Sequence, residues 1–325
     1  MKRKVGFPAT LFYFTYAPFW RAFLEGIGDE VIFSPLTTKE ILDDGIRVTI
    51  TDACVPIKLY HGHILSLKEK VDCLFIPRLV SVDKMATFCP KFLGLPDMIK
   101  ATTEKLPEII APTIDLKNSL FSLWKVCRKL AHKAGCKLSI TLRAYIAALK
   151  THQKYNELLH RGLFPLEAMK LLWEGGQEYL PEKRPLNIAV LGYPYQIYDP
   201  YISVNMLKFL EELDVRVWTM DMIPRKKLTP YTNILEKNLF WYYSNLVIWS
   251  LYYYLKQPQI DGIIHVTAFA CGPDAMVDKL MELEMKKYDH IPFMSLTIDE
   301  HSGEAGIRTR LEAFVDMIKF RRKQI

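Results

Sequence analysis

Short apolar runs alternate along the chain with longer segments whose apolar residues recur every three or four positions, and this alternation constrains the fold more than any other feature. The short runs predict buried strands and the longer segments predict amphipathic helices. The predicted strands are residues 5–8, 30–33, 71–76, 108–110, 186–191, 215–219, 260–266 and 291–296, and the predicted helices include 18–26, 121–134, 204–213, 274–288 and 308–319. Because strands and helices alternate, we expect an α/β protein with parallel sheets covered on both faces.

The chain has 325 residues, and its pattern restarts with a strand after the charged stretch EKRP at residues 182–185. A chain of this length usually forms more than one domain. We therefore predict an N-terminal α/β lobe over residues 1–184, which includes a long helical segment at 120–179, and a C-terminal α/β lobe over residues 185–325.

The composition argues against several classes of function. The net charge of +7 is the balance of 43 basic and 36 acidic residues spread along the chain, so nucleic-acid binding is disfavoured. The basic run at 320–323 is better explained as a last helical turn that opposes the helix dipole. The chain has neither a GxxxxGK[ST] loop nor a strand followed by GxGxxG, so we do not expect it to hydrolyse ATP. No signal-peptide pattern follows the N-terminus, which predicts a cytoplasmic protein with reduced thiols.

The longest uncharged run, residues 238–255, is rich in aromatic side chains. It approaches the length of a membrane span, but it contains five tyrosines, two asparagines and two serines. A span needs about 20 predominantly apolar residues. We therefore expect a buried or interface helix whose rings form a homodimer or heterodimer contact or the wall of a cofactor site.

The six cysteines fall into two groups. Those interpreted as structural lie in a predicted strand, in a predicted helix and after a helix-stop glycine, and they are Cys73, Cys127 and Cys136. Cys54, Cys89 and Cys271 instead lie in loops beside proline or glycine, and Cys271 follows a predicted strand, where α/β sheets bind ligands. A proline just after a cysteine suits the first turn of a helix. We therefore expect three thiolates at helix N-termini, with pKa values lowered by the helix dipole.

The spacing of these three cysteines leaves the kind of site open. Structural zinc usually draws four ligands from close pairs such as CxxC, and this chain has no such pair. Three widely separated cysteines suit a [4Fe-4S] cluster in which one iron has no cysteine ligand. Three unrelated thiols are the alternative on spacing alone.

Several motifs resemble one family over nearly the whole chain. They are TDACVPIK at 51–58 with HGH at 61–63, FCPK at 88–91, LGYPYQIYDP at 191–200, FACGPD at 269–274 and TIDEHSGEAG at 297–306. Together they look like the acyl-CoA dehydratase activase-related proteins. These belong to the superfamily of 2-hydroxyacyl-CoA dehydratases, benzoyl-CoA reductases and double-cubane-cluster proteins. The match is specific because the motifs are long, ordered and spread over both predicted lobes.

The resemblance implies two Rossmann-like or flavodoxin-like lobes with a [4Fe-4S] cluster between them on Cys54, Cys89 and Cys271. It also implies a partner, an ATP-hydrolysing activase of the actin-like kinase fold that supplies low-potential electrons. The expected function is an iron–sulfur component for reduction or radical dehydration of a small or CoA-linked substrate. The chain departs from true dehydratases because it has no recognisable CoA-binding motif. A double cubane needs six cysteine ligands, so a single cubane is expected.

Two further groups follow predicted strands and are candidates for chemistry. Tyr193 and Tyr195 would donate hydrogen bonds to a substrate or to cluster sulfides. Glu300 and His301 would form a general acid and base pair. The alternatives are an aromatic loop packed on the other lobe, and a capping and lobe-closing role for the acidic segment. The remaining candidates are interpreted as core histidines, and they are His61, His63 and His265.

Two other functions stay open at this stage. The chain could serve as a non-catalytic accessory or scaffold subunit of an activase–dehydratase system. It could also be a zinc-binding or metal-free protein that binds a small molecule in an α/β fold.

Overall fold

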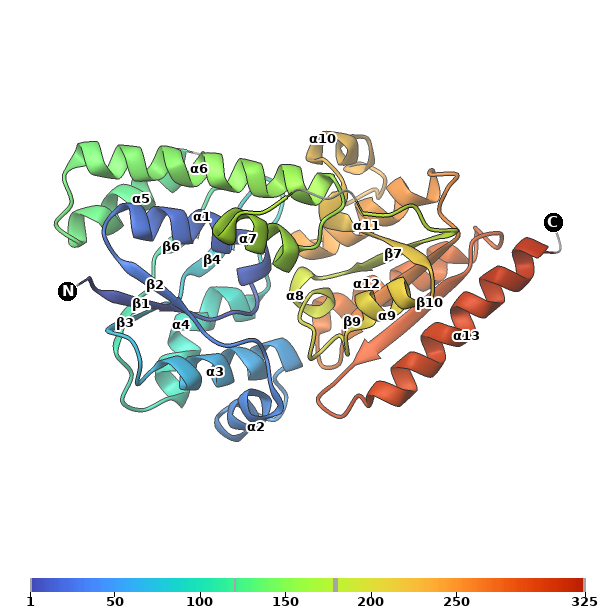
Figure 1. The fold of residues 1–325 in the computed structure, drawn as a ribbon, viewed down its shortest axis with the longest axis horizontal. Helices are drawn as coiled ribbons and strands as arrows, with labels where there is room; N and C mark the ends of the chain where they lie inside the picture. Colours follow the sequence, from blue (N-terminus) through green and yellow to red (C-terminus); the bar gives the residue numbers. More distant parts are fainter. Residues whose placement is uncertain (1, 120, 178–180, 324–325) are drawn as a thin grey trace.

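The protein folds into two α/β lobes that lie side by side (Figure 1). The structure is a computed structural model that describes residues 2–119, 121–177 and 181–323. Each lobe holds a four-stranded parallel sheet. The strands of one sheet precede residue 111 and those of the other follow residue 185. The predicted fold class is confirmed, while the boundary between residues 184 and 185 stays a prediction.

The N-terminal sheet has the strand order β2-β1-β3-β5. Its strands are β1 (Lys4–Phe7), β2 (Glu30–Phe33), β3 (Cys73–Phe75) and β5 (Glu108–Ile110), and its helices are α1 (Tyr13–Gly26), α2 (Lys39–Val48), α3 (Val55–Leu67) and α4 (Pro90–Thr102). The central strand β3 is buried throughout because helices cover both faces of a parallel sheet. Beyond the sheet lies a parallel pair that the sequence analysis did not predict, β4 (Arg78–Ser81) and β6 (Thr113–Asp115).

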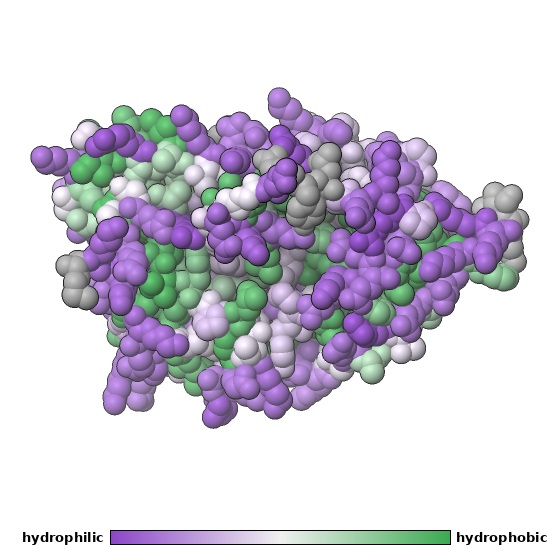
Figure 2. Space-filling model, in the orientation of Figure 1, coloured by the Kyte–Doolittle hydropathy of each residue, from purple (hydrophilic) through white to green (hydrophobic). Residues whose placement is uncertain are grey.

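The predicted helical segment at 120–179 contains α5 (Phe121–Lys133), α6 (Leu138–His160) and α7 (Pro165–Glu174). Its two predicted end residues, Leu120 and Tyr179, lie outside the described residues. Helix α6 runs along the N-terminal lobe and reaches the junction with the other lobe (Figure 1). Figure 2 shows hydrophobic side chains over the α5–α6 end of the molecule, where Leu138, Leu142 and Ile146 of α6 are exposed.

The C-terminal sheet has the strand order β10-β9-β7-β8. Its strands are β7 (Leu186–Gly192), β8 (Val215–Thr219), β9 (Gly262–Ala268) and β10 (Phe293–Ile298). Its helices are α8 (Pro194–Ile197), α9 (Met206–Glu212), η1 (Met220–Met222), α10 (Arg225–Leu228), η2 (Thr229–Tyr231), α11 (Tyr242–Leu255), α12 (Gly272–Met285) and α13 (Glu304–Lys323). Numbered from its own first strand, each four-stranded sheet has the order 2-1-3-4. This order is typical of flavodoxin-like sheets, which bind ligands at the carboxyl ends of strands 1 and 3.

The predicted aromatic helix is α11, and it lies inside the molecule. Twelve of its residues are buried, from Tyr242 to Tyr254. This burial confirms the prediction of a buried helix, and the rings of Tyr242 and Tyr243 pack against Phe88 of the N-terminal lobe. Among the described residues, no helix combines the length and apolar character needed to cross a membrane.

Helix α1 begins five residues earlier than predicted, so that Pro18 lies inside it. A proline has no N–H to donate to the carbonyl oxygen four residues before it, and this usually breaks a helix. Here the Tyr155 hydroxyl of α6 donates to that oxygen, on Phe14, at 2.5 Å. The long helical segment therefore compensates for a proline that the sequence analysis used as a helix start.

Helix α13 lies along the outer edge of the C-terminal lobe (Figure 1). Its last turn contains Arg321, Arg322 and Lys323, as the dipole argument predicted. Arg322 also donates to the Pro185 carbonyl oxygen at 2.6 Å and pairs with Asp261. These contacts fasten the end of α13 to the start of the sheet it covers.

Candidate functional site

The three motif cysteines each precede a helix. Cys54 is the N-cap of α3, Cys89 is the N-cap of α4 and Cys271 is the N-cap of α12. In each helix a proline occupies one of the first two positions, where the missing N–H is harmless because those groups have no partner within the helix. The prediction of three helix N-termini is confirmed.

The structure brings these cysteines together from both lobes. Burial is the main cause that raises the pKa of the Cys54 and Cys271 thiols. The charge of Cys89 also raises the pKa of Cys54, and the charges of Cys54 and Cys89 raise that of Cys271. Cys54 and Cys89 come from the N-terminal lobe and Cys271 from the C-terminal lobe. Cys271 follows β9, the third strand of its sheet, at the edge where the topology predicts a ligand.

The direction of the thiol pKa shifts corrects one prediction. Burial raises the pKa of Cys54 to about 11 and raises those of Cys89 and Cys271 as well. Nearby backbone amides and the ammonium of Lys91 lower the pKa of Cys54, but by less than the loss of water raises it. The expectation that helix N-termini lower these pKa values was therefore wrong in net direction. Thiols held in this way are protonated at neutral pH and must lose protons when they bind a metal.

The donor set is the test of whether these residues fit a metal group. Within the described ranges, no three side chains from His, Cys, Asp and Glu are arranged around one point as a single ion requires. A zinc ion gathers its thiolates at about 2.3 Å, whereas a [4Fe-4S] cluster places a different iron beside each cysteine. The two kinds of site therefore differ in how far apart the three sulfurs must lie.

An unpartnered ring nitrogen lies near the same cysteines. His61 of α3 is fully buried, and its Nδ1 lies 2.9 Å from the Ile57 carbonyl oxygen. Its Nε2 has no hydrogen-bond partner among the described residues. Burial lowers the pKa of His61, and Lys91 lowers it further, so His61 shares with Cys54 the neighbourhood of the Lys91 ammonium. A buried donor or acceptor without a partner indicates that a further group belongs in this place.

The predicted tyrosines follow β7 and lie beside the cysteines. Burial raises the pKa of Tyr195 far above its ordinary value, and the charges of all three motif cysteines raise it further. The Tyr193 hydroxyl contacts Ser244 Oγ at 2.8 Å. Gly192 allows this turn, because a Cβ there would lie 2.5 Å from the Val266 carbonyl oxygen of β9. Tyr195 is therefore the tyrosine placed to meet a group held by the cysteines.

Helix α11 supplies an aromatic wall that the sequence analysis left open. The Tyr243 ring lies 5.9 Å from the Tyr195 ring and 5.4 Å from the Phe88 ring, which directly precedes Cys89. The Tyr243 hydroxyl also contacts Thr15 Oγ1 at 3.3 Å across the lobes. Of the two roles considered for this helix, its position favours the wall of a site.

Glu300 pairs with a lysine of the other lobe, and His301 lies in the turn before α13. Glu300 accepts from the Lys58 ammonium at 2.5 Å, in an ion pair that joins the two lobes. Burial raises the pKa of Glu300, but Lys58 lowers it more, so the carboxylate stays charged. His301 is exposed, and its backbone N–H donates to Asp299 Oδ1 at 2.8 Å. These positions favour lobe closure and a turn before α13 over proton transfer.

The other two histidines are held by polar partners. His63 contacts Ser34 Oγ at 2.7 Å and Thr37 Oγ1 at 3.0 Å, and burial lowers its pKa to about 3. Thr37 in turn donates to Asp199 of the other lobe. Both ring nitrogens of His63 are thus satisfied, as the interpretation of a core histidine requires.

His265 of β9 lies between two carboxylates. Its Nδ1 is 2.8 Å from Asp278 Oδ1, and its Nε2 is 3.4 Å from Asp274 Oδ1, a contact at ion-pair distance without hydrogen-bond geometry. Asp274 also accepts from Gln196 Nε2 at 2.9 Å. A buried charge cluster therefore lies one turn after Cys271.

Sequence comparison bears on the identity of this chain. A family model described as a CoA enzyme activase uncharacterised domain matches residues 4–223. The chain belongs to this family. The match confirms the resemblance to activase-related proteins and includes Cys54, Cys89, Tyr193 and Tyr195, whereas Cys271 lies beyond it. A search of curated proteins finds no match to the chain.

The activase-related protein also contains site residues that sequence reasoning missed. Lys58 and Lys91 lie within the matched motifs, each in the first turns of a helix that follows a motif cysteine. Their position in TDACVPIK and FCPK was the available signal. Tyr243 carried no signal beyond the aromatic run, because its contacts with Phe88 and Tyr195 depend on how the chain packs.

Proposed function

We propose that this activase-related protein holds a [4Fe-4S] cluster on Cys54, Cys89 and Cys271 in the reducing cytoplasm. Its role would be that of an iron–sulfur component for reduction or dehydration of a small or CoA-linked substrate. An ATP-hydrolysing activase would supply the electrons. The observation that carries the proposal is the meeting of three half-buried cysteines from two lobes, each at a helix N-terminus. When bound, such a cluster supplies a one-electron centre with one iron free of cysteine.

The residues around the cysteines suit an anionic group. The first amides of α3, α4 and α12 have no partners within their helices and carry the positive end of the helix dipole. The Lys91 ammonium adds a positive charge close to Cys54 and Cys89. Tyr195 stays protonated because burial raises its pKa, so its phenol is kept as a hydrogen-bond donor.

The same site excludes water through its aromatic wall and is closed by charged contacts between the lobes. The rings of Phe88, Phe92 and Tyr243 pack around Tyr195 and the start of α4. The Lys58–Glu300 ion pair holds α3 to the loop after β10. Glu300 is therefore assigned to positioning and Tyr195 to contact with the bound group.

The cluster is tested by anaerobic purification of the full chain. The expected result is a brown protein with about four irons per chain. Cys54→Ala, Cys89→Ala and Cys271→Ala should each lose most of the iron. Cys136→Ala is the matched control, because its Sγ donates to the Ile27 carbonyl oxygen at 3.0 Å and Cys136 does not cap α3, α4 or α12. A colourless anaerobic protein that contains stoichiometric zinc, or equal iron loss in Cys136→Ala, would contradict the proposal.

The role of electron acceptor is tested separately from cluster binding. The iron-loaded protein is mixed with an activase, ATP and a reductant, and its visible absorption is followed. Bleaching that requires ATP, followed by recovery on addition of substrate, is expected of a catalytic component. An iron-loaded protein that the activase binds but never reduces would instead be a scaffold subunit.

A further inference from the structure

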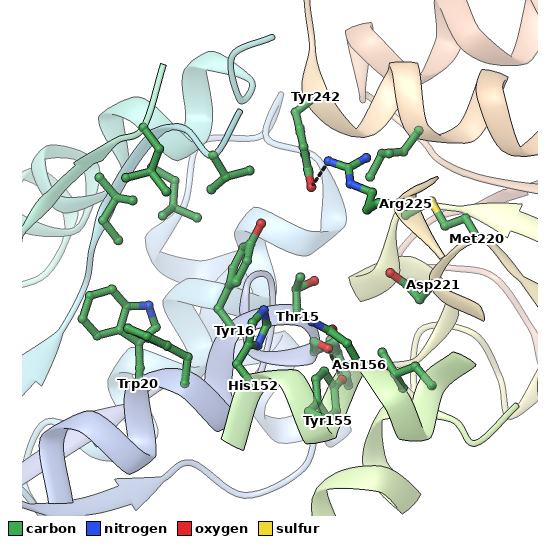
Figure 3. Close-up of a pocket in the computed structure, with 18 of the residues that line it drawn as sticks. Thr15, Tyr16, Trp20, His152, Tyr155, Asn156, Met220, Asp221, Arg225 and Tyr242 are labelled. Atoms are coloured by element: carbon green, nitrogen blue, oxygen red, sulfur yellow. Dashed lines mark hydrogen bonds between the residues drawn. The ribbon is translucent and has the colours of Figure 1, made fainter. Parts of the chain in front are cut away.

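A cavity between the lobes is not used by the proposed function. Its volume is about 460 Å³, which is in the range of small-molecule sites. Helices α1 and α6 line one side, and η1, α10 and α11 line the other (Figure 3). Its aromatic lining consists of Phe14, Tyr16, Phe19, Trp20, Tyr155 and Tyr242. None of the motif cysteines lines it, so it is a separate space.

Polar groups gather where α10 and α11 meet the cavity. Arg225 Nη2 donates to the Tyr242 hydroxyl at 2.9 Å, and the same nitrogen lies 3.5 Å from the Asp83 carboxylate. The Tyr16 hydroxyl points toward Tyr242 in Figure 3. A guanidinium has five N–H donors, and the contacts found for Arg225 in the described residues use one of its nitrogens. The Arg225 side chain is half exposed, at the mouth of the cavity, with donors left for an incoming acceptor.

Arg225 is the cation among the described lining residues. Burial lowers the pKa of His152 to about 4, so its ring is neutral. Burial raises the pKa of Asp221 to about 6, so this carboxylate is mostly charged at pH 7, and its Oδ2 accepts from the Tyr198 hydroxyl at 3.0 Å. The cavity thus combines apolar aromatic walls with the Arg225 guanidinium at its mouth and the Asp221 carboxylate in its lining. Arginine holds carboxylates through two parallel charge-assisted hydrogen bonds.

We propose that this cavity binds an apolar monocarboxylate, with the carboxylate on Arg225 and the hydrocarbon body between the aromatic side chains of α1 and α6. The proposal does not rest on a cluster at the cysteines. The two sites are nevertheless neighbours, because the Phe88 ring before Cys89 lies 5.0 Å from the Tyr242 ring that lines the cavity. One aromatic layer separates the bound acid from the cysteine site.

Calorimetric titration of the full chain with 2-naphthylacetate and with its neutral amide tests the assignment. The acid should bind, and the amide should bind at least about tenfold more weakly, because it cannot form the charge-assisted pair. Arg225→Gln should weaken the acid by a similar factor and leave the amide unchanged. Lys226→Gln removes an exposed charge from the same short helix and should leave both ligands unchanged.

A second variant tests the position of the hydrocarbon body. Leu149 of α6 lines the cavity and is 42% exposed, so Leu149→Phe should fold normally and reduce binding of acid and amide alike. Equal affinity for acid and amide in the wild type would overturn the proposal. So would an equal effect of Arg225→Gln and Lys226→Gln, unchanged affinity in Leu149→Phe, or no binding of the acid at millimolar concentration.

Discussion

The charge state of His265 is a prediction that follows directly from its surroundings. Burial alone would lower the pKa of His265, but the carboxylates of Asp274 and Asp278 raise it by more than burial lowers it, to about 9. The ordinary value is 6.5. A shift of one pKa unit corresponds to about 1.4 kcal/mol, so the folded protein favours the imidazolium by roughly 3 kcal/mol. The ring is therefore expected to stay charged at neutral pH although it is fully buried.

The sign of the stability change follows from proton counting. Between pH 6.5 and about 9 the folded protein binds a proton at His265 that the unfolded chain releases, so the free energy of unfolding falls as the pH rises through this range. The stabilisation that protonated His265 gives the folded protein is complete below pH 6.5 and is lost above pH 9. The difference in unfolding free energy between the wild type and His265→Gln should therefore shrink by about 3 kcal/mol across that window.

NMR titration of the histidine Cε1 signals measures the pKa without assuming a single unfolding transition. The chain has eight histidines, and the signal that disappears in His265→Gln identifies the buried one. His290→Gln is the control, because its side chain is 69% exposed. A pKa at or below 6.5 for His265 would refute the reasoning. So would a difference in unfolding free energy between the wild type and His265→Gln that does not change between pH 6.5 and 9.

Three other tests concern how the lobes and helices are held. Lys58→Met leaves the mostly buried Glu300 carboxylate without its partner and should lower the free energy of unfolding by about 3 kcal/mol. Adding Glu300→Gln to Lys58→Met should restore most of the lost melting temperature. Strictly additive losses in the double mutant would contradict this pairing. Gly62→Ala places a Cβ 1.8 Å from a carbonyl oxygen of α2 and should cost about 3 kcal/mol or more, while Gly94→Ala, with its nearest atom at 3.9 Å, should unfold like the wild type. Burial raises the pKa of Asp199 to about 6, so the folded protein binds the extra proton between pH 4 and 6 and loses stability as the pH rises. The free energy of unfolding of Asp199→Asn, relative to that of the wild type, should therefore rise by about 3 kcal/mol between pH 4 and 6. Parallel curves of unfolding free energy against pH for the two proteins would count against a buried carboxylate.

The sequence was sufficient for the alternation of strands and helices and for the helix N-termini because both depend on local signals. A buried strand such as β7 is a continuous apolar run, and a cysteine followed by proline, as at Cys89, marks the first turn of a helix. The pair formed by β4 and β6 was not predicted, because neither RLVS at 78–81 nor TID at 113–115 is an apolar run.

The environment of the site depends on contacts far apart in the sequence. Lys58 and Glu300 are 242 positions apart, and nothing in either motif shows that they pair. The sign of the thiol pKa shifts was also missed, because it depends on burial under rings such as Tyr195 and Tyr243, one of which comes from a helix read only as aromatic. Local pattern predicts where a side chain lies along an element, and packing between elements decides how much water reaches it.

Motif side chains also connect the loops that carry the cysteines. Asp274, one turn after Cys271, accepts from Gln196 of the LGYPYQIYDP motif and raises the pKa of the Cys271 thiol. The positive charge of the His265 imidazolium offsets the negative charge of the Asp274 carboxylate. The net charge near Cys271 therefore depends on whether His265, whose pKa is raised to about 9, is protonated.

Across the lobes, Thr37 donates to Asp199 and Lys58 pairs with Glu300. These contacts fix the gap between Cys271 on one lobe and the two cysteines on the other before any ligand binds. The proposed cluster would take cysteines from both lobes and would need such a fixed gap, because each sulfur must lie within a few tenths of an ångström of its ideal position. Lobe-joining residues should therefore affect iron retention as well as stability: Glu300→Gln, which keeps the shape of the side chain but not its charge, should release iron faster than the wild type under a chelator. An unchanged release rate would show that the cysteines hold their spacing without this ion pair.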